Sequence, residues 1–170
     1  EWVPFNIMEP FVLDVFKSMG VPQMDAEICK NVLLDADLKG LDTHGVNRLK
    51  PVYYDRVLDG RQKPVTELEL IREGPTTAVF DAHNGMGMVA SHKAMETAIA
   101  KAKEYGMGMV VVRNSTHFGI AGYYAEMASK QGVLGISGTN ARPSIAPTFG
   151  VEPMLGTNPL TFSFPTDEDF

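Results

Sequence analysis

The chain has 170 residues, of which 44% are hydrophobic, and a formal net charge of −6. This length allows one sizeable hydrophobic core. Its 15 lysines and arginines are scattered, without the basic stripe that follows a nucleic-acid backbone, so nucleic acid is not an expected partner.

Cys29 is the only cysteine, which excludes a disulfide within the chain and a zinc site built on several thiolates. It lies in the apolar-periodic stretch AEICKNVLL, so we interpret it as a buried packing residue. No apolar run approaches the ~20 residues of a membrane span, and no signal-peptide pattern opens the chain. These features predict a cytoplasmic protein with no membrane partner.

The opening third of the sequence predicts helices. Apolar residues recur at helical spacing over 9–19, where Gly20 is the expected end, and over 25–40, where Asp25 is the expected N-cap. A third helix is expected over 43–60.

After residue 65 the pattern changes to short strands that alternate with helices, and the end at FSFPTDEDF suggests that a longer protein continues beyond residue 170. The order predicts an α/β or α+β fold, with a helical N-terminal segment (1–65) and a mixed α/β segment (66–170). Strands are expected over 67–74, 76–83, 108–114, 132–140 and 159–165, and helices over 88–106 and 121–132.

The first candidate site is Asp42-Thr43-His44-Gly45 followed by Arg48. On a helix that begins near Thr43, His44 and Arg48 would share a face. Arginine can bind a carboxylate through two parallel hydrogen bonds while histidine gives a proton to a neighbouring carbonyl, which suits a 2-oxo acid. An N-capped helix with a surface histidine and a surface arginine is the open alternative.

The second candidate is RNSTHFG, directly after the apolar run MVVV. Ends of buried strands are where α/β proteins place their sites, so His117 is a candidate acid/base or cofactor contact. A helix that begins near Gly119 would present free N–H groups to a phosphate or carboxylate. A turn in which Ser115 and Thr116 merely cap is the alternative.

The third candidate is the loop that holds the two Gly-Thr-Asn triplets, 138–140 and 156–158. Loops this long are uncommon unless functional, and small polar residues suit close approach to a ligand, but a structural loop is an equal alternative. Residues 85–90 match G-x-G-x-x-A. Because the next strand ends in Arg113 instead of an acid, we do not interpret this match as a Rossmann phosphate loop.

Three segments in order, LLDADLKGLDTHGVNRL, VRNSTHFGIAGYYAEMA and APTFGVEPMLGTNPLTFSFP, resemble the malate/L-lactate dehydrogenase family, which is unrelated to the Rossmann-type dehydrogenases. That family includes ureidoglycolate and sulfolactate dehydrogenases and diketogulonate and piperideine-carboxylate reductases. The resemblance covers nearly the whole chain. It implies an enzyme that uses NAD or NADP, is usually a homodimer, has its own cofactor-binding fold and needs no metal.

The resemblance also implies roles for particular residues. His44 is the proton donor to the ketone, with Thr43, where serine is common, assisting it; Arg48 and Thr157 contact the substrate. His117 is an acid/base in some members. The implied cofactor contacts are His117, Phe118, Gly119, Ile120, Ala121 and Asn140. Family chains are longer, and much of their cofactor site lies beyond residue 170.

We therefore expect an oxidoreductase that transfers a hydride between NAD or NADP and a small 2-hydroxy/2-oxo acid, of the malate or lactate class. Residues 1–65 would form the substrate and dimer side, and 66–170 the first part of a cofactor-binding domain. The alternatives are a family enzyme for ureidoglycolate, sulfolactate or a cyclic imine acid, and a non-catalytic nicotinamide-binding homologue. A metal-dependent hydrolase using Asp42, His44 and His117 is a third.

Oxidation requires a neutral His44. From the ordinary titration of histidine we expect activity to rise through a pKa of about 6.5 or above.

Overall fold

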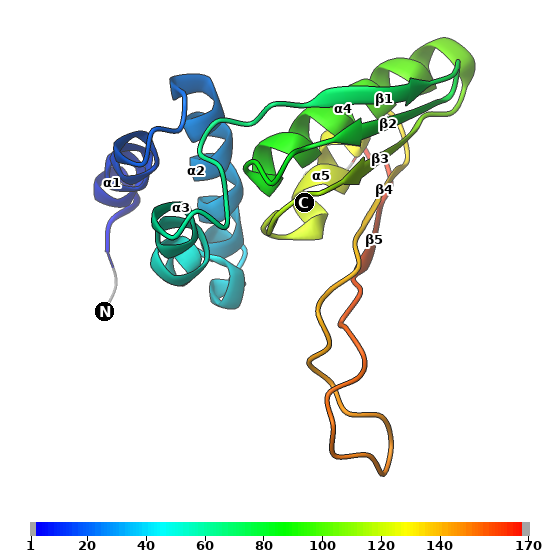
Figure 1. The fold of residues 1–170 in the computed structure, drawn as a ribbon. Coiled ribbons are helices and arrows are strands. Elements are labelled where there is room, and N and C mark those ends of the chain that lie inside the picture. The colour runs from blue at the N-terminus through cyan, green and yellow to red at the C-terminus, as the bar shows by residue number, and fades with distance from the viewer. Residues whose placement is uncertain (1–2, 168–170) are drawn as a thin grey trace. The chain divides into compact units, whose positions relative to one another are not determined.

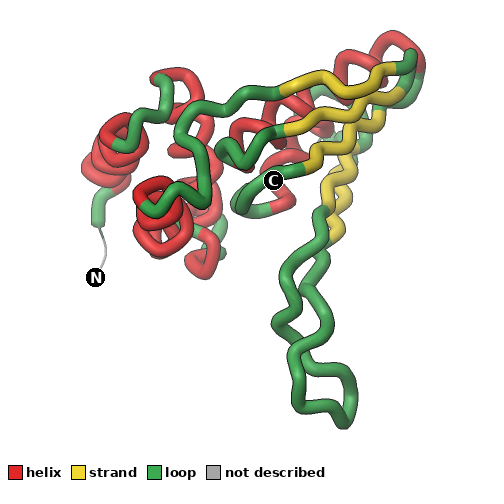
Figure 2. Tube along the Cα trace, viewed as in Figure 1, coloured by secondary structure: helices red, strands yellow, loops and turns green. Residues whose placement is uncertain are grey.

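The computed structural model describes residues 3–167 (Figure 1). Backbone contacts divide the chain into two compact units, which meet in the sequence between Ile120 and Ala121 and are described separately below. Helices come first and strands alternate with helices afterwards (Figure 2), so the expected mixed α/β class with a helical N-terminal part is confirmed.

Helices α1 (Phe5–Ser18) and α2 (Gln23–Leu38) pack against each other in the first unit. Helix α2 begins after Pro22, so Asp25 lies inside its first turn, and the expectation that Asp25 is the N-cap is wrong. The Asp25 carboxylate instead pairs with Lys93 at 3.1 Å. The larger fully buried side chains of this helical pair are Val12, Phe16, Cys29, Val32 and Leu33.

Cys29 has no exposed surface, which confirms its interpretation as a packing residue. Burial raises the pKa of its thiol, so the thiol stays protonated at neutral pH. Within residues 3–167, the helices are too short or too polar to cross a membrane.

The helix expected over 43–60 is divided into four short helical elements. Gly45, with φ −86° and ψ −149°, interrupts the chain between two short turns, and Pro51 lacks the N–H that an α-helical ladder needs. A π-helix, in which each turn holds one extra residue, follows the second turn. The elements in order are 3-10 turns Asp42–His44 and Val46–Arg48, the π-helix Leu49–Tyr54 and the α-helix α3 (Asp55–Leu58).

The sheet of the first unit has the order β1-β2-β3. Strand β1 is antiparallel to β2, whereas β2 and β3 are parallel and connected through α4, which packs against both. Because parallel strands end at the same edge, the segment after β3 leaves the sheet beside the end of β2. The elements are β1 (Glu69–Glu73), β2 (Thr77–Asp81), α4 (Gly87–Tyr105) and β3 (Met109–Arg113).

In the second unit, α5 (Ala121–Ser129) packs on an antiparallel pair of strands, β4 (Gly135–Gly138) and β5 (Leu160–Ser163). The residues between the strands, 139–159, form a long loop, here called the arm, that extends away from them (Figure 1). Ile145 and Leu155 form a bridge across this arm.

Candidate active site

His44 and Arg48 are brought together by hydrogen bonding and not by a shared helix face. Each ends one of the two 3-10 turns, and Gly45 separates these turns. Arg48 Nε donates a hydrogen bond to the carbonyl oxygen of Thr43 at 2.6 Å. No acidic side chain of residues 3–167 pairs with Arg48, so its two terminal nitrogens remain for a carboxylate.

Asp37, on the last turn of α2, fixes the backbone between His44 and Arg48. Its Oδ2 accepts a hydrogen bond from Val46 N at 2.7 Å, and a Cβ at Gly45 would overlap its carboxylate. Glycine at position 45 is therefore required by this close approach. The sequence analysis did not identify Asp37. Its position in the first segment that resembles the family could have indicated that it lies near the site.

The imidazole of His44 is held at one nitrogen. Its Nδ1 lies 3.0 Å from Thr43 Oγ1, which leaves Nε2 for a reacting group. Partial burial, and then the charge of Arg48, lower the pKa of His44. The expected pKa of about 6.5 or above is therefore wrong in direction, because water is partly excluded from the ring.

His117 stacks on His44, with ring centroids 5.8 Å apart and planes inclined by 24°. Its Nδ1 lies 3.2 Å from Gly119 N and 2.8 Å from the Tyr53 hydroxyl. A backbone N–H can only donate, so Nδ1 must be an acceptor, and Tyr53 donates to it as well. The neutral ring consequently carries its proton on Nε2.

Burial and the charges of neighbouring groups keep His117 neutral. Desolvation is the largest effect, followed by His44, Arg56 and Arg48, and together they lower the pKa of His117 to about 4. Burial also raises the pKa of Tyr53, so its hydroxyl stays protonated and can donate.

Tyr53 is completely buried and packs edge-on against Phe16 in the helical core at 5.9 Å. Sequence reasoning missed Tyr53, because its partner His117 lies 64 residues further along the chain.

Thr116 connects the His117 segment to the start of α4. Its hydroxyl accepts a hydrogen bond from Gly87 N at 3.0 Å and donates one to Gly85 O at 2.8 Å. The N–H of Gly87, which a phosphate loop would offer to a ligand, is thus used within the protein. Thr116 has the capping role that the alternative interpretation gave it, while His117 faces His44.

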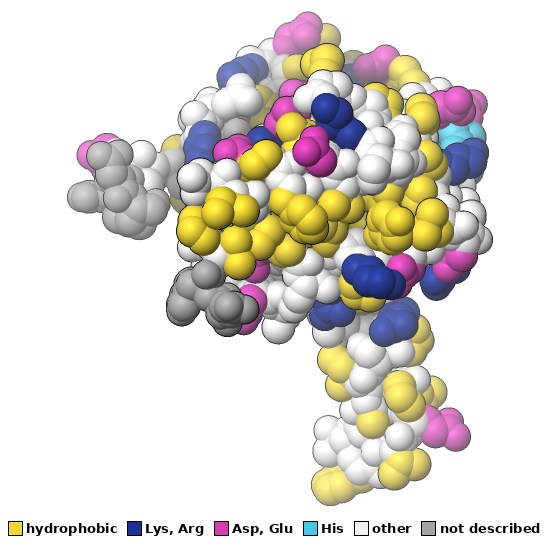
Figure 3. All heavy atoms as spheres, turned by 90° about the vertical axis from the view of Figure 1, so that its left-hand side faces the viewer, with side chains coloured by type: hydrophobic (Ala, Val, Ile, Leu, Met, Phe, Trp, Pro, Cys, Tyr) yellow, Lys and Arg dark blue, Asp and Glu magenta, His cyan; other side chains and the backbone are white. Residues whose placement is uncertain are grey.

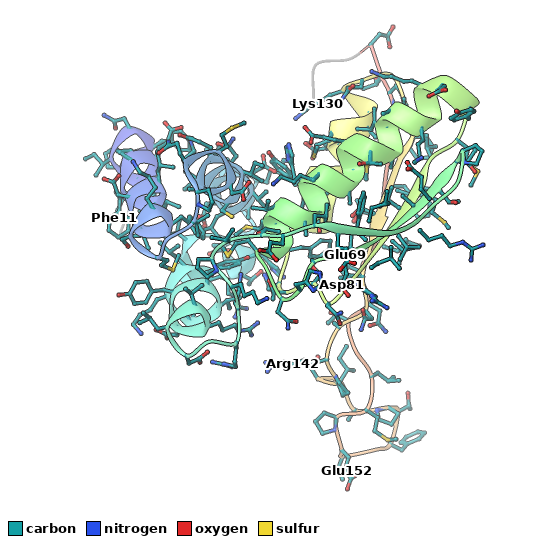
Figure 4. The ribbon with its side chains drawn as sticks, turned by 45° about the horizontal axis from the view of Figure 1, so that its top comes forward. Phe11, Glu69, Asp81, Lys130, Arg142 and Glu152 are labelled. Atoms are coloured by element: carbon teal, nitrogen blue, oxygen red, sulfur yellow. The ribbon has the colours of Figure 1, made fainter. Side chains whose placement is uncertain are left out.

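A buried carboxylate ties together the strand ends from which this segment begins. Asp81 Oδ2 accepts hydrogen bonds from Arg113 Nε at 2.8 Å and Asn114 Nδ2 at 2.7 Å, and Oδ1 accepts one from His83 N at 2.9 Å. These hydrogen bonds lower the pKa of Asp81, and the bond from the His83 backbone has the largest effect. Glu69, beside Asp81 in Figure 4, pairs with the His83 ring at 2.8 Å.

The remaining predicted residues differ in their surroundings. Gly119 has φ +78° and packs closely on Val32, a combination that suits only glycine. Ile120 and Ala121 are buried, so any cofactor contact from either would be through the backbone. Phe118 is partly exposed.

Asn140 and Thr157 lie in the second unit, at the base of the arm, and both are exposed. The two Gly-Thr-Asn triplets meet there, since Asn158 Oδ1 accepts a hydrogen bond from Ala141 N at 2.8 Å. The first unit thus unites Thr43, His44, Arg48 and His117, whereas the roles of Asn140 and Thr157 stay predictions. In the described part of the chain, no group of three or more histidine, cysteine or acidic residues is placed to hold a metal ion.

The comparison with known families decides the classification. A family described as malate/L-lactate dehydrogenase matches residues 3–170. The chain belongs to the malate/L-lactate dehydrogenase family. This confirms the resemblance carried by the three sequence segments.

Members of the family share both sequence and fold with this chain. The malate dehydrogenase of Pyrococcus abyssi is 48% identical over 164 residues, which are 96% of this chain and 45% of the relative. The L-sulfolactate dehydrogenase of Methanocaldococcus jannaschii is 47% identical over 153 residues, or 90% and 44% of the two chains. The crystal structure of malate dehydrogenase from Entamoeba histolytica, 50% identical, superposes with a TM-score of 0.96 over 100% of this chain and 47% of its own. The chain thus spans less than half the length of these relatives.

Proposed function

We propose that the protein is an oxidoreductase that transfers a hydride between NAD or NADP and C2 of a small 2-hydroxy acid, with malate as the favoured substrate. The observation that carries the proposal is the stacked pair His44 and His117 beside Arg48, whose terminal nitrogens have no acidic partner among residues 3–167. The names of the similar malate dehydrogenases support the substrate.

Each of these residues has a distinct part in the proposed reaction. Arg48 binds the substrate carboxylate, with Thr157 as the second contact. His44 Nε2 takes the proton of the 2-hydroxyl group during oxidation and returns it to the oxygen during reduction, and Thr43 holds the opposite ring nitrogen. His117 acts as a hydrogen-bond donor through Nε2–H, since its Nδ1 is already occupied. General acid/base catalysis of this kind contributes about 10²–10⁴ in rate.

The donors of the first unit fit part of a nicotinamide cofactor, because the Nε2–H of a neutral imidazole suits a carboxamide or ribose oxygen. When bound, NAD or NADP supplies the hydride acceptor or donor. We propose that His117, Phe118 and Gly119 lie along it, together with Ile120, Ala121 and Asn140. One relative is named for NADP(+) and another for NAD(+), and both cofactors are retained in the proposal.

We further propose that the enzyme is a cytoplasmic homodimer, with residues 1–65 on the substrate and dimer side and 66–170 as the first part of the cofactor-binding domain. Helix α1 exposes Ile7 and Phe11 by 58% and 53%, and hydrophobic side chains gather on this face (Figure 3). A second copy would cover them. The cytoplasmic location is supported by the single, buried thiol of Cys29.

The test is a turnover assay of the complete protein, which follows NAD(P)H absorbance with NAD or NADP and malate, lactate, sulfolactate or ureidoglycolate. We expect the highest kcat/KM with malate. A higher kcat/KM with sulfolactate or ureidoglycolate would make that compound the substrate and keep the enzyme in the same family. Saturable cofactor binding without turnover would favour a non-catalytic homologue, and no cofactor binding would overturn the proposal.

The low pKa of His44 predicts a pH dependence. Because oxidation needs the neutral ring, kcat/KM for malate oxidation should stay level above neutral pH and fall only below about pH 6.5, as His44 becomes protonated. Reduction needs the protonated ring, so its kcat/KM should decline as pH rises through the same pKa. Initial rates in both directions between about pH 5 and about pH 9 check this. An oxidation profile that loses activity already above about pH 7 would contradict it.

A further inference from the structure

Arg56, in α3, has a guanidinium group without a partner. Its Nε is buried and has no hydrogen-bond partner. Its side chain forms no hydrogen bond or ion pair with any residue in the described range 3–167. Arg56 as a whole is half-buried, and a buried polar atom without a partner is costly, which indicates that something outside this set of contacts completes it.

The acidic groups near Arg56 along the chain are committed to other cations. Asp55 pairs with Lys50 Nζ at 2.8 Å, and the Asp59 carboxylate accepts a hydrogen bond from Arg61 Nε at 2.7 Å. The hydrogen bond from the Arg61 side chain is the main cause of the lowered pKa of Asp59, and the charge of Arg56 is the last of its causes. Neither carboxylate therefore neutralises Arg56 by direct contact.

Arg56 is placed on the side of the candidate active site. It follows Tyr53 by three residues, where the π-helix runs directly into α3. The hydroxyl of Tyr53 contacts His117, which stacks on His44. In agreement with this placement, the charge of Arg56 contributes to the low pKa of His117.

Two arginines without an acidic partner in the described range, Arg48 and Arg56, act on the stacked imidazoles. The groups that shift the pKa of His44 and His117 through their charge are Arg48, Arg56 and, for His117, His44, and no carboxylate is among them. One anionic group bound to Arg48 leaves the second arginine uncompensated. The local charge therefore matches a substrate with two anionic groups.

We propose that Arg56 binds the distal anionic group of a dianionic 2-hydroxy acid, a carboxylate or a sulfonate, while Arg48 binds the carboxylate at C1. Arg56 is then the residue that separates dianionic substrates from monoanionic ones such as lactate. This inference rests on the proposed function and adds a specificity-determining residue to it.

The test compares Arg56→Gln and Arg56→Lys with wild type, using malate and lactate in the complete enzyme. We expect Arg56→Gln to lower kcat/KM for malate about 10- to 100-fold, as for the loss of a charge-assisted hydrogen bond, and to change kcat/KM for lactate less than about 3-fold. Arg56→Lys should restore part of the malate activity. Arg61→Gln, which removes an arginine that has its own acidic partner, is the matched control and should leave the malate-to-lactate ratio unchanged.

An equal loss with both substrates would overturn the inference, because it would show that Arg56 only supports the fold. If Arg56→Gln does not fold, the wild-type enzyme is tested with malate and with malate 4-amide, which lacks the distal negative charge. The kcat/KM for malate should be at least about 10-fold higher. Equal values would overturn the role of Arg56. If wild type turns over neither malate nor lactate while it binds cofactor, it is the proposed function that fails.

Discussion

We expect His44→Ala to lower kcat of the complete enzyme by about 10²–10⁴ in both directions, the contribution of a general acid/base, and to leave cofactor binding intact. The reason is that Nε2 of His44 is the ring nitrogen that its neighbours leave unbound, whereas Nδ1 lies against the Thr43 hydroxyl. We do not expect His117 to take over this role, because its proton is on Nε2 and its low pKa opposes a second proton. Steady-state rates and titration of NAD(P)H fluorescence measure the two effects.

A matched control removes a different histidine from the same unit. His83 has a positive φ of 47° and pairs with an exposed glutamate. Asparagine tolerates such a backbone conformation, so His83→Asn should retain kcat within about 3-fold. Comparable losses in both variants would contradict the assignment of His44. Full activity in His44→Ala with loss in His117→Ala would transfer the acid/base role to His117.

Arg48→Lys should raise KM for malate about 10- to 100-fold with a smaller loss in kcat. Lysine keeps the positive charge but cannot present two parallel donors to a carboxylate. It also loses the Nε–H that anchors Arg48 to the carbonyl oxygen of Thr43, so its charge is less well positioned beside His44. KM and kcat from the malate assay separate weaker binding from slower chemistry.

Arg72→Lys serves as the control for a change from arginine to lysine, since Arg72 is exposed on β1. It should leave KM unchanged. A kcat loss of about 10²-fold or more in Arg48→Lys without a rise in KM would show that Arg48 acts on the transition state and not on substrate binding.

The sequence predicted the regular elements well, because their hydrophobic periodicity is local. Strands β2 and β3 lie inside the predicted runs, and α4 begins one residue before the predicted helix and ends within it. The family motifs also identified His44, Arg48 and His117, which the structure then places together or in contact.

The sequence could not predict the contacts that depend on irregular backbone. A helical wheel through 43–60 assumes a constant turn, but two 3-10 turns and a π-helix replace it. The proximity of Tyr53 to His117 joins two segments that are far apart in the chain, and no local period encodes it. The same holds for Asp37, whose carboxylate closes on the backbone of Val46.

The π-helix at Leu49–Tyr54 has a consequence for how the site can evolve. A π turn holds one residue more than an α turn, so the loss of one residue here can convert it into an α turn and leave the following helix α3 in register. We expect a single-codon deletion here to change the side chains of the turn itself, next to Tyr53 and His117, while Arg48 before it and Arg56 after it keep their places. The π turn is thus a place where the chain can lose a residue and remodel the surroundings of His117 without moving the helices on either side.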